Sequence, residues 1–532
     1  MRNFLLLFFS FSLFSVFSQD NLSVPPRLVV GIKIDGLQAE HLQRMSKYFT
    51  PGGFRKIASE SVVVEKMLHN IVSAGNAPDV ATFMTGALPY YHGISSDYYY
   101  NRQDNQPVSI LTDKEQVGIG TQDKFSAHHL LATTLTDEII LSNPLSQVHV
   151  VAIDPEDAIM MGGHTATSVS WIDDSANRWA TTAYYSKGLS RWADQMNING
   201  QFKQLSTDGW MPSASISTYI HPTANGSRSV AFGYNPSDRQ EGNTTKTILK
   251  NTPAANTLVT ELAKSIFEKE SLGTDNHTDA LMLQFTVKMP NQIGTSLVFA
   301  EQEDLYIRLD RNIQTLISII TSKIGADNLL LFLVGSGSDN HSSITLGKNQ
   351  IPAGLFNADR ALALLNTYLM AVYGQEKWIS GYYGKNIYIN KKKIEDKKLD
   401  LTEFQNRIIE FLLEFEGVQA AYSSQSLLNF FGESTDSRSK YRNSFHKKVS
   451  GDISIVLMPG WLEVDNQGRI VGDANSPQVF VPFYLMRKGL NPTQLSGNYN
   501  TVDIAPTITD LLGISRPNAC VGKKIQVPVY VR

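Results

Sequence analysis

The sequence predicts an α/β protein in which a mostly parallel central sheet is flanked by helices and carries inserted lobes. Apolar, β-branched runs of strand length recur along the 532-residue chain, and amphipathic stretches with helical spacing lie between several of them. The first of these runs ends in Asp35 and Gly36. Because ligands bind at the carboxyl ends of the strands in open α/β sheets, Asp35 is the first candidate for a functional residue.

The expected elements follow the hydrophobic pattern in chain order. Residues 27–35 form an almost continuous apolar run, which is typical of a strand buried on both faces. The clearest helix spans residues 302–323, where leucine and isoleucine recur close to helical spacing. Further strands are predicted at residues 147–153, 280–287, 328–335 and 452–458.

The amino-terminal segment has the pattern of a secretory signal peptide over residues 1–18. A short basic start precedes residues 4–17, which are almost entirely Phe, Leu, Val and Ser. Cleavage after Ser18 predicts an exported protein, with the periplasm as the default compartment and the cell surface or the outer membrane as alternatives. No other apolar run is long enough to span a bilayer, so no transmembrane segment is expected after signal cleavage.

Residues 27–532 are predicted to form one core that two insertions interrupt. The insertions are expected at about residues 165–250 and 355–445, where the alternation of strand and helix patterns is lost. The net charge of −3 gives no electrostatic reason to expect a nucleic-acid partner. Cys520 is the single cysteine, which excludes an intrachain disulfide and a cysteine-rich metal site.

Short motifs occur along nearly the whole of this core. They include the strand that ends in Asp35, Gly-Gly-Phe at 52–54, Ala-Thr-Phe-Met-Thr-Gly at 81–86, His-Gly-Ile at 92–94, Gly-Gly-His at 162–164, Pro-Gly-Trp at 459–461 and Thr-Val-Asp-Ile-Ala-Pro-Thr at 501–507. Together they resemble bacterial exported phosphatases of the alkaline phosphatase superfamily, in the branch related to type I phosphodiesterase/nucleotide pyrophosphatases. The resemblance implies the alkaline-phosphatase-like fold. His92 and His164 fall in motifs that position loops, and both are expected to be packed or hydrogen-bonded.

The resemblance also implies a site with two zinc ions, a set of Asp and His ligands, and a Thr or Ser nucleophile for phosphoryl transfer. Asp35 is the one ligand that this chain clearly retains. Asn76 stands at the nucleophile position, and an amide does not form the phosphoryl ester that a hydroxyl forms. Ser73, three residues earlier, is expected to be a loop residue.

The remaining ligand positions carry residues that do not bind zinc well, because they offer a thioether, a hydroxyl or no donor atom. These residues are Met289, Ile293, Ser336, Gly337 and Phe480. Asp339 and His341 lie just beyond the third ligand stretch. A single rearranged metal site built from Asp35, Asp339 and His341 therefore stays open as an alternative.

The positions that contact substrate in the family are acidic in this chain. The resemblance places Asp97 where the family has an Asn, and Asp154 and Glu156 where it has a Lys and an Arg. Like charges repel, so these three carboxylates are expected to disfavour phosphate binding. Alternatively, they hold one hard cation such as Ca²⁺ or Mg²⁺ through oxygen ligands.

A retained framework around a substituted site predicts an exported pseudoenzyme. Such a protein would serve as a binding or structural component of the bacterial envelope, with protein partners in the periplasm or at the outer membrane and with no cofactor. The alternative is a metal-dependent phosphomonoesterase or phosphodiesterase with a rearranged site, for which zinc is the expected cofactor. A third hypothesis is a binding module. In it, the cleft that corresponds to the family's active site, lined by residues such as Asn76 and Phe480, accepts a neutral or cationic molecule.

Overall fold

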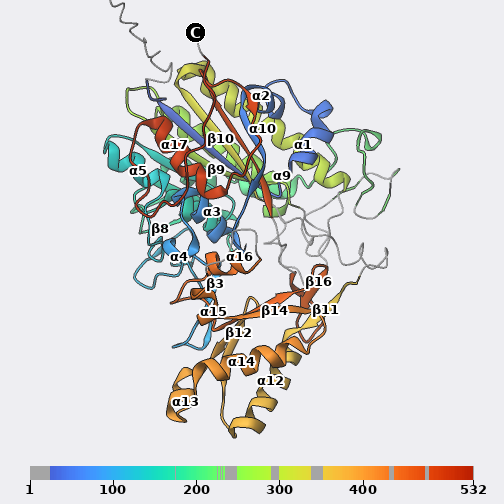
Figure 1. The fold of residues 1–532 in the computed structure, drawn as a ribbon. Helices are drawn as coiled ribbons and strands as arrows, with labels where there is room; N and C mark the ends of the chain where they lie inside the picture. Colours follow the sequence, from blue (N-terminus) through green and yellow to red (C-terminus); the bar gives the residue numbers. More distant parts are fainter. Residues whose placement is uncertain are drawn as a thin grey trace, which may run out of the picture.

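A large mixed sheet of mostly parallel strands forms the centre of the molecule (Figure 1). The computed structural model describes residues 24–72, 74–173, 175–223, 226–227, 229, 232–233, 249–288, 299–336, 352–430, 437–473 and 479–530. Within these residues the sheet has ten strands, in the order β19 (Thr493–Gln494), β2 (Val62–Leu68), β18 (Phe480–Arg487), β10 (Leu329–Ser336), β1 (Leu28–Asp35), β9 (Asp279–Thr286), β6 (Val148–Val151), β7 (Ser168–Asp173), β8 (Arg178–Thr182) and β5 (Gly118–Ile119).

Strand β1 lies in the middle of this sheet and pairs in parallel with β10 on one side and β9 on the other. All residues of these three strands are buried, as the continuous apolar runs predict. The register aligns Asp35 with Ser336 of β10 and with Thr286 of β9. The carboxyl ends of the three strands therefore meet at one edge of the sheet, which is where Asp35 lies.

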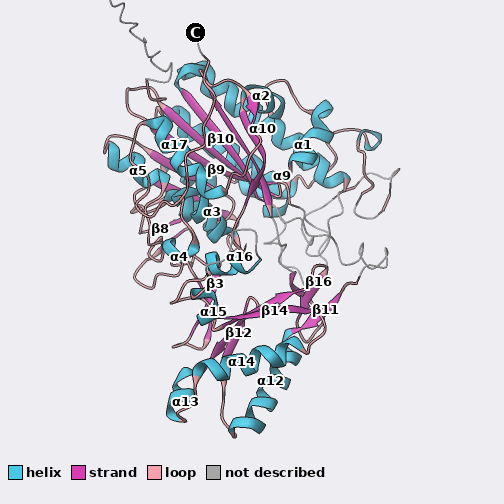
Figure 2. Ribbon diagram, viewed as in Figure 1, coloured by secondary structure: helices cyan, strands magenta, loops and turns pink. Residues whose placement is uncertain are grey.

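Two layers of helices cover the two faces of the sheet (Figure 2). The first layer contains α1 (Ala39–Met45), α2 (Phe54–Glu60), α7 (Arg191–Ile198), α8 (Gln201–Thr207), α9 (Pro253–Lys269) and α10 (Ala300–Ile324). The second contains α3 (Asn76–Thr85), α5 (Leu135–Ser142), α6 (Pro155–Gly162) and α17 (Ile504–Leu512). This arrangement confirms the predicted fold class.

A separate lobe, drawn in yellow and orange in Figure 1, has its own hydrophobic core. Its elements are β11 (Gly354–Asn357), α12 (Ala358–Tyr373), β12 (Ile379–Tyr383), β13 (Asn386–Ile389), α13 (Lys391–Asp396), α14 (Leu401–Leu413), β14 (Val418–Ser423), α15 (Ser424–Leu428), β15 (Ile453–Leu457), β16 (Trp461–Val464) and β17 (Ile470–Asp473). The strand expected at residues 452–458 is β15, and it pairs with β13 and β14 of this lobe rather than with the central sheet. An apolar run of strand length does not itself specify which sheet it joins, so that expectation was wrong about the sheet.

The lobe contacts the core through the hairpin of β3 (Tyr98–Asn101) and β4 (Gln106–Ser109). The Tyr100 hydroxyl donates to the Ser380 carbonyl at 2.6 Å, and Arg102 forms an ion pair with buried Asp452 at 2.8 Å. At Gly381 a Cβ atom would lie 2.2 Å from the Tyr100 ring, so only glycine lets this ring pack on β12.

No helix in the described ranges combines the length and the apolar character needed to cross a bilayer. The predicted signal peptide at residues 1–18 lies outside the described residues. The insertion boundaries drawn from the sequence, at about 165–250 and 355–445, remain predictions.

Candidate functional site

The alternation of side chains along β1 decides which residues face the second helix layer. Leu28, Val30, Ile32 and Ile34 pack into the first hydrophobic core, so residues 29, 31, 33 and 35 point to the opposite face. Lys33 and Asp35 therefore share one face, next to α6. Both side chains are almost fully buried.

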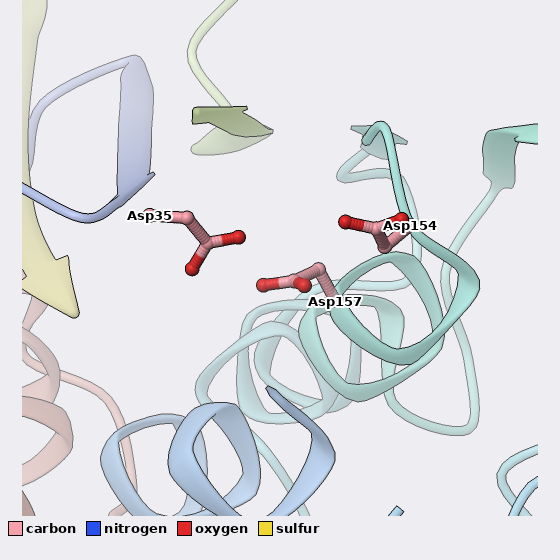
Figure 3. A group of neighbouring side chains, drawn as sticks. All are labelled: Asp35, Asp154 and Asp157. Carbon is pink, nitrogen blue, oxygen red and sulfur yellow. The ribbon is translucent and has the colours of Figure 1, made fainter. Parts of the chain in front are cut away.

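Three carboxylates converge at this edge of the sheet (Figure 3). Asp35 ends β1, Asp154 is the residue before α6, and Asp157 lies in the first turn of that helix. Each contributes one ligand atom, and these atoms all lie within 4.8 Å of one another. Parallel strands and a helix that starts at their carboxyl ends bring together acidic residues that are far apart in the sequence.

Lys33 neutralises part of this negative charge. Its ammonium group lies 2.9 Å from Oδ1 of Asp35 and also bonds Oδ1 of Asp157. Burial alone would lower the pKa of Lys33, but the charges of Asp157 and Asp35 raise it above its ordinary value. Burial would likewise raise the pKa of Asp35, but Lys33 and Lys288 hold it below its usual range. Lys33 and Asp35 are thus charged at every moderate pH.

Polar side chains from two neighbouring strands fix Asp35 in place. Ser336 donates to Oδ1 at 2.6 Å, and Gln284 of β9 donates to Oδ2 at 2.8 Å. The same Gln284 amide lies 3.5 Å from Oδ2 of Asp154, and its carbonyl oxygen accepts from the backbone N–H of Ile153 at 2.6 Å. Gln284 therefore links the carboxylates of β1 and α6.

Asp157 is the least satisfied member of the cluster. Its side chain is fully buried, and Oδ2 has no hydrogen-bond partner among the described residues. Burial raises the pKa of Asp157 to about 8, against the lowering effect of Lys33, and the charges of Asp35 and Asp154 add to the rise. A buried carboxylate oxygen without a partner is costly, so this atom points to a bound cation or a retained proton.

Asn76 and Asp97 meet at the amino-terminal end of α3. The backbone N–H groups of Asn76 and Ala77 donate to the two carboxylate oxygens of Asp97 at 3.0 and 2.7 Å. Gly75 has a φ of 130°, and a Cβ atom there would lie 2.0 Å from the Asp97 carboxylate. Glycine is required for this contact, which places the acidic group against the first turn of α3.

Glu156 adds a further carboxyl group to the same end of α6. Burial raises the pKa of Glu156 to about 8, and the neighbouring charges of Asp97 and Asp154 contribute. Burial also raises the pKa of Asp97 to about 6, although its two backbone hydrogen bonds oppose the rise. Asp154 is more exposed and forms an ion pair with Lys250 at 3.1 Å. Crowding of these acids therefore keeps part of the group protonated near neutral pH.

The structure places the other predicted residues as follows. Ser336 bonds Asp35 directly, whereas Phe480 starts β18 and pairs with Leu68. His92 is fully buried beside Thr82 at 3.2 Å, and His164 bonds Asp137 at 2.9 Å, as the sequence predicts for both histidines. The other predicted positions lie outside the described residues; they are Ser73, Met289, Ile293, Gly337, Asp339 and His341.

Sequence reasoning missed three residues of the site: Lys33, Gln284 and Asp157. The described cluster offers only carboxylate oxygens as donors. That donor set fits a hard cation such as Mg²⁺ or Ca²⁺ better than a pair of zinc ions, because zinc sites are usually built with histidine or cysteine. Oδ2 of Asp157, which has no partner within the described part of the chain, supports the fit.

Comparisons with known proteins agree on one family. Residues 29–473 match the family described as type I phosphodiesterase / nucleotide pyrophosphatase. Alkaline phosphatase PafA of Elizabethkingia meningoseptica is 26% identical over 529 residues, which cover 96% of this chain and 95% of that protein. Alkaline phosphatase PhoV of Synechococcus elongatus is 27% identical over 521 residues, with 94% and 92% covered. The crystal structure of wild-type alkaline phosphatase PafA matches with a TM-score of 0.84 and 25% identity, covering 95% of this chain and 99% of that chain.

These relatives contradict the prediction of a pseudoenzyme. Proteins that match nearly the full length of the chain are named alkaline phosphatases, and the fold is that of such an enzyme. The comparison supports the alternative, a phosphoric ester hydrolase. The chain belongs to the type I phosphodiesterase / nucleotide pyrophosphatase family, within the alkaline phosphatase superfamily.

Proposed function

We propose that this chain is a metal-dependent phosphoric ester hydrolase, a phosphomonoesterase or phosphodiesterase whose site is rearranged around Asp35. The observation that carries the proposal is the convergence of Asp35, Asp154 and Asp157 at the carboxyl edge of the central strands. The unpartnered Oδ2 of Asp157 and the names of the full-length relatives support it. Sheet edges of this kind are where α/β enzymes bind their ligands.

Asp35, Asp154 and Asp157 would hold the cation. A bound divalent cation supplies Lewis-acid polarisation of a phosphoryl oxygen and lowers the pKa of bound water. Lys33 occupies the Oδ1 atoms of Asp35 and Asp157, and Gln284 donates to Oδ2 of Asp35, so Oδ2 of Asp157 is the oxygen for which the described residues offer no partner. Lys33 therefore supplies a fixed positive charge beside the cluster, and it reduces the electrostatic cost of bringing the acids together.

Glu156 would contact the phosphoryl group as a neutral acid. A carboxyl group that keeps its proton donates a hydrogen bond, as a Lys or Arg does, without repelling an anion. The pKa of Glu156, raised to about 8, supports this role, whereas Asp97, with a pKa of about 6, accepts from two backbone N–H groups at the start of α3. The charge reversal at Glu156 then limits the pH range of the reaction rather than abolishing substrate binding.

We also place the protein outside the cytoplasm, on the strength of the signal-peptide pattern at residues 1–18. Export suits a phosphatase that acts on phosphoric esters from the surroundings. The periplasm remains the default compartment. The protein partners predicted from the sequence remain a prediction.

Chelation followed by metal addition tests the proposed function. The purified chain is stripped with EDTA and assayed on an aryl phosphate monoester and a bis-aryl diester after addition of Mg²⁺, Ca²⁺, Mn²⁺ or Zn²⁺. We expect turnover of at least one ester to return with metal, together with stoichiometric metal in elemental analysis. Absence of turnover with all four metals on both esters, in a chain that circular dichroism shows to be folded, would refute the proposal.

The pH dependence of turnover is expected to follow Glu156. Below its pKa of about 8 the carboxyl is neutral and donates to phosphate, and above that value the carboxylate repels the substrate. At saturating metal, which holds Asp157 ionised, turnover should therefore fall as pH rises through about 8. Glu156→Gln keeps a donor without a titrating proton, so its turnover should persist at higher pH. A pH–rate profile of kcat/KM that is the same for both proteins would contradict this role.

The effect of Glu156→Gln on the free energy of unfolding tests the same pKa shift without an activity assay. Because the folded-state pKa of Glu156 lies above the ordinary value of 4.5, the folded state binds more protons between 4.5 and about 8. Wild-type stability should then decline as pH rises through that window, by at most about 1.4 kcal/mol per pH unit for one proton. Urea unfolding of Glu156→Gln should show a weaker decline.

A further inference from the structure

A cavity of about 510 Å³ lies between the core and the lobe. Its core wall comes from Val72 and Ala74 and from Ser95, Ser96 and Tyr98, and its lobe wall comes mainly from β12, β13, β15 and β16. Binding pockets for small molecules are commonly of this size and commonly lie where two lobes meet. The cluster of Asp35, Asp154 and Asp157 does not line it.

Aromatic rings form a large part of the cavity wall. Tyr98 of the core and Tyr383 of the lobe face each other with ring centroids 6.0 Å apart and planes inclined by 53°. Tyr388 also lines the cavity, and its ring packs against Tyr100. Tyr98 is 43% exposed although it belongs to a strand, so much of this ring is available to a ligand. Inclined aromatic faces of this kind attract cations through their quadrupoles.

The charged groups of the wall are mostly acidic. Glu463, Asp359 and Asp465 line the cavity, with Lys385 as the one basic residue among its described lining residues. Asp465 is already bound to Arg469 at 2.7 Å. Glu463 is only 4% exposed, and its Oε1 accepts from the Tyr382 hydroxyl at 2.7 Å. Burial raises the pKa of Tyr382 well above its ordinary value, so the hydroxyl stays a donor to Glu463.

We propose that this cavity binds a small organic cation of the alkylammonium class, held against the contacting rings of Tyr98 and Tyr383 on the cavity wall and attracted by the buried carboxylate of Glu463. Aromatic faces together with a buried acid favour a cation with an apolar surface over an anion or a sugar. A fully hydrated metal ion would gain little from the rings. The proposal concerns binding alone and does not depend on the hydrolase activity.

Residues that line the cavity are close in the sequence to residues of the proposed reaction site. Ala74 precedes Asn76 by two residues, and its carbonyl accepts from the backbone N–H of Asp97 at 3.2 Å. Tyr98 follows Asp97 directly. A cation bound against Tyr98 and Tyr383 would therefore order the segments that place Asp97 at the start of α3.

Calorimetric titration with choline tests the proposal against dimethylbutanol, the isostere in which a carbon atom replaces the charged nitrogen. We expect saturable binding of choline and at least about tenfold weaker binding of the uncharged isostere, which corresponds to about 1.4 kcal/mol. Equal affinity for both compounds, or no saturable binding of choline at millimolar concentrations, would overturn the proposal.

Two pairs of variants locate the site. Tyr383→Phe keeps an aromatic face and should retain choline binding, whereas Tyr383→Leu should weaken it by about tenfold. Glu463→Gln removes the charge and keeps the shape, so it should also weaken binding; Glu414→Gln, on the exposed end of α14, should leave it unchanged. Choline affinity that is unaffected by Tyr383→Leu and Glu463→Gln would place binding elsewhere and refute the assignment.

Discussion

Replacing Lys33 with methionine is expected to destabilise the folded chain by about 3–5 kcal/mol, because it removes one partner of a buried charge network. Lys33 is 1% exposed and contacts both Asp35 and Asp157, whose side chains are also buried. Methionine fills a similar volume, so the decrease in the free energy of unfolding reflects the lost charge interactions rather than lost packing. Urea unfolding at neutral pH measures the effect.

Two further measurements identify the cause of that loss. Asp35→Asn in the Lys33→Met background should recover part of the stability, since it removes the acid that Lys33 keeps ionised. Lys56→Met is the matched control, because Lys56 makes an exposed ion pair with Glu60 on α2 and should cost less than about 1 kcal/mol. A cost for Lys33→Met as small as that of the control would show that Lys33 does not compensate the buried acids.

The strand that carries this network was predictable, but the network was not. The apolar run at residues 27–35 indicated a buried strand and placed Asp35 at its carboxyl end. Lys33 looks like a single polar interruption of that run. Only the two-residue repeat of the strand, combined with the position of α6, shows that Lys33 and Asp157 share one buried space.

The candidate site was predicted in part. The acidic character of Asp97, Asp154 and Glu156 is evident in the sequence, whereas the pKa shifts that keep a carboxyl neutral depend on burial and on neighbours brought together by folding. The pseudoenzyme hypothesis rested on the loss of the family's nucleophile and zinc ligands, although rearranged metal sites stayed open as alternatives. It did not consider that Asp157, one residue beyond the substrate-contact positions, could join Asp35 and Asp154 in a new cluster.

Asp35→Asn is expected to reduce turnover by more than about 100-fold, which is the upper range for losing a residue that only orients a metal ligand. The amide keeps the size of the side chain, and its one oxygen accepts from only one of the two donors that now bond Asp35, Ser336 and Gln284. Its single carbonyl oxygen replaces two anionic oxygens that could bind a metal ion. The cluster thereby loses the one carboxylate that stays ionised at every moderate pH. Metal content and kcat/KM on the same sample measure the effect.

Asp279→Asn is the matched control for Asp35→Asn, since Asp279 starts β9 at the opposite end of the same sheet. It is 1% exposed and accepts from the backbone N–H groups of Gln147 and Gly273, each at 2.8 Å. This variant should lose stability, because buried backbone donors lose a charged acceptor, while metal content and turnover per folded molecule stay unchanged. If the two variants lose turnover in proportion to their loss of folded protein, Asp35 is a structural residue and the metal site lies elsewhere. If only Asp35→Asn loses metal and turnover, the carboxyl edge of β1 is the reaction site.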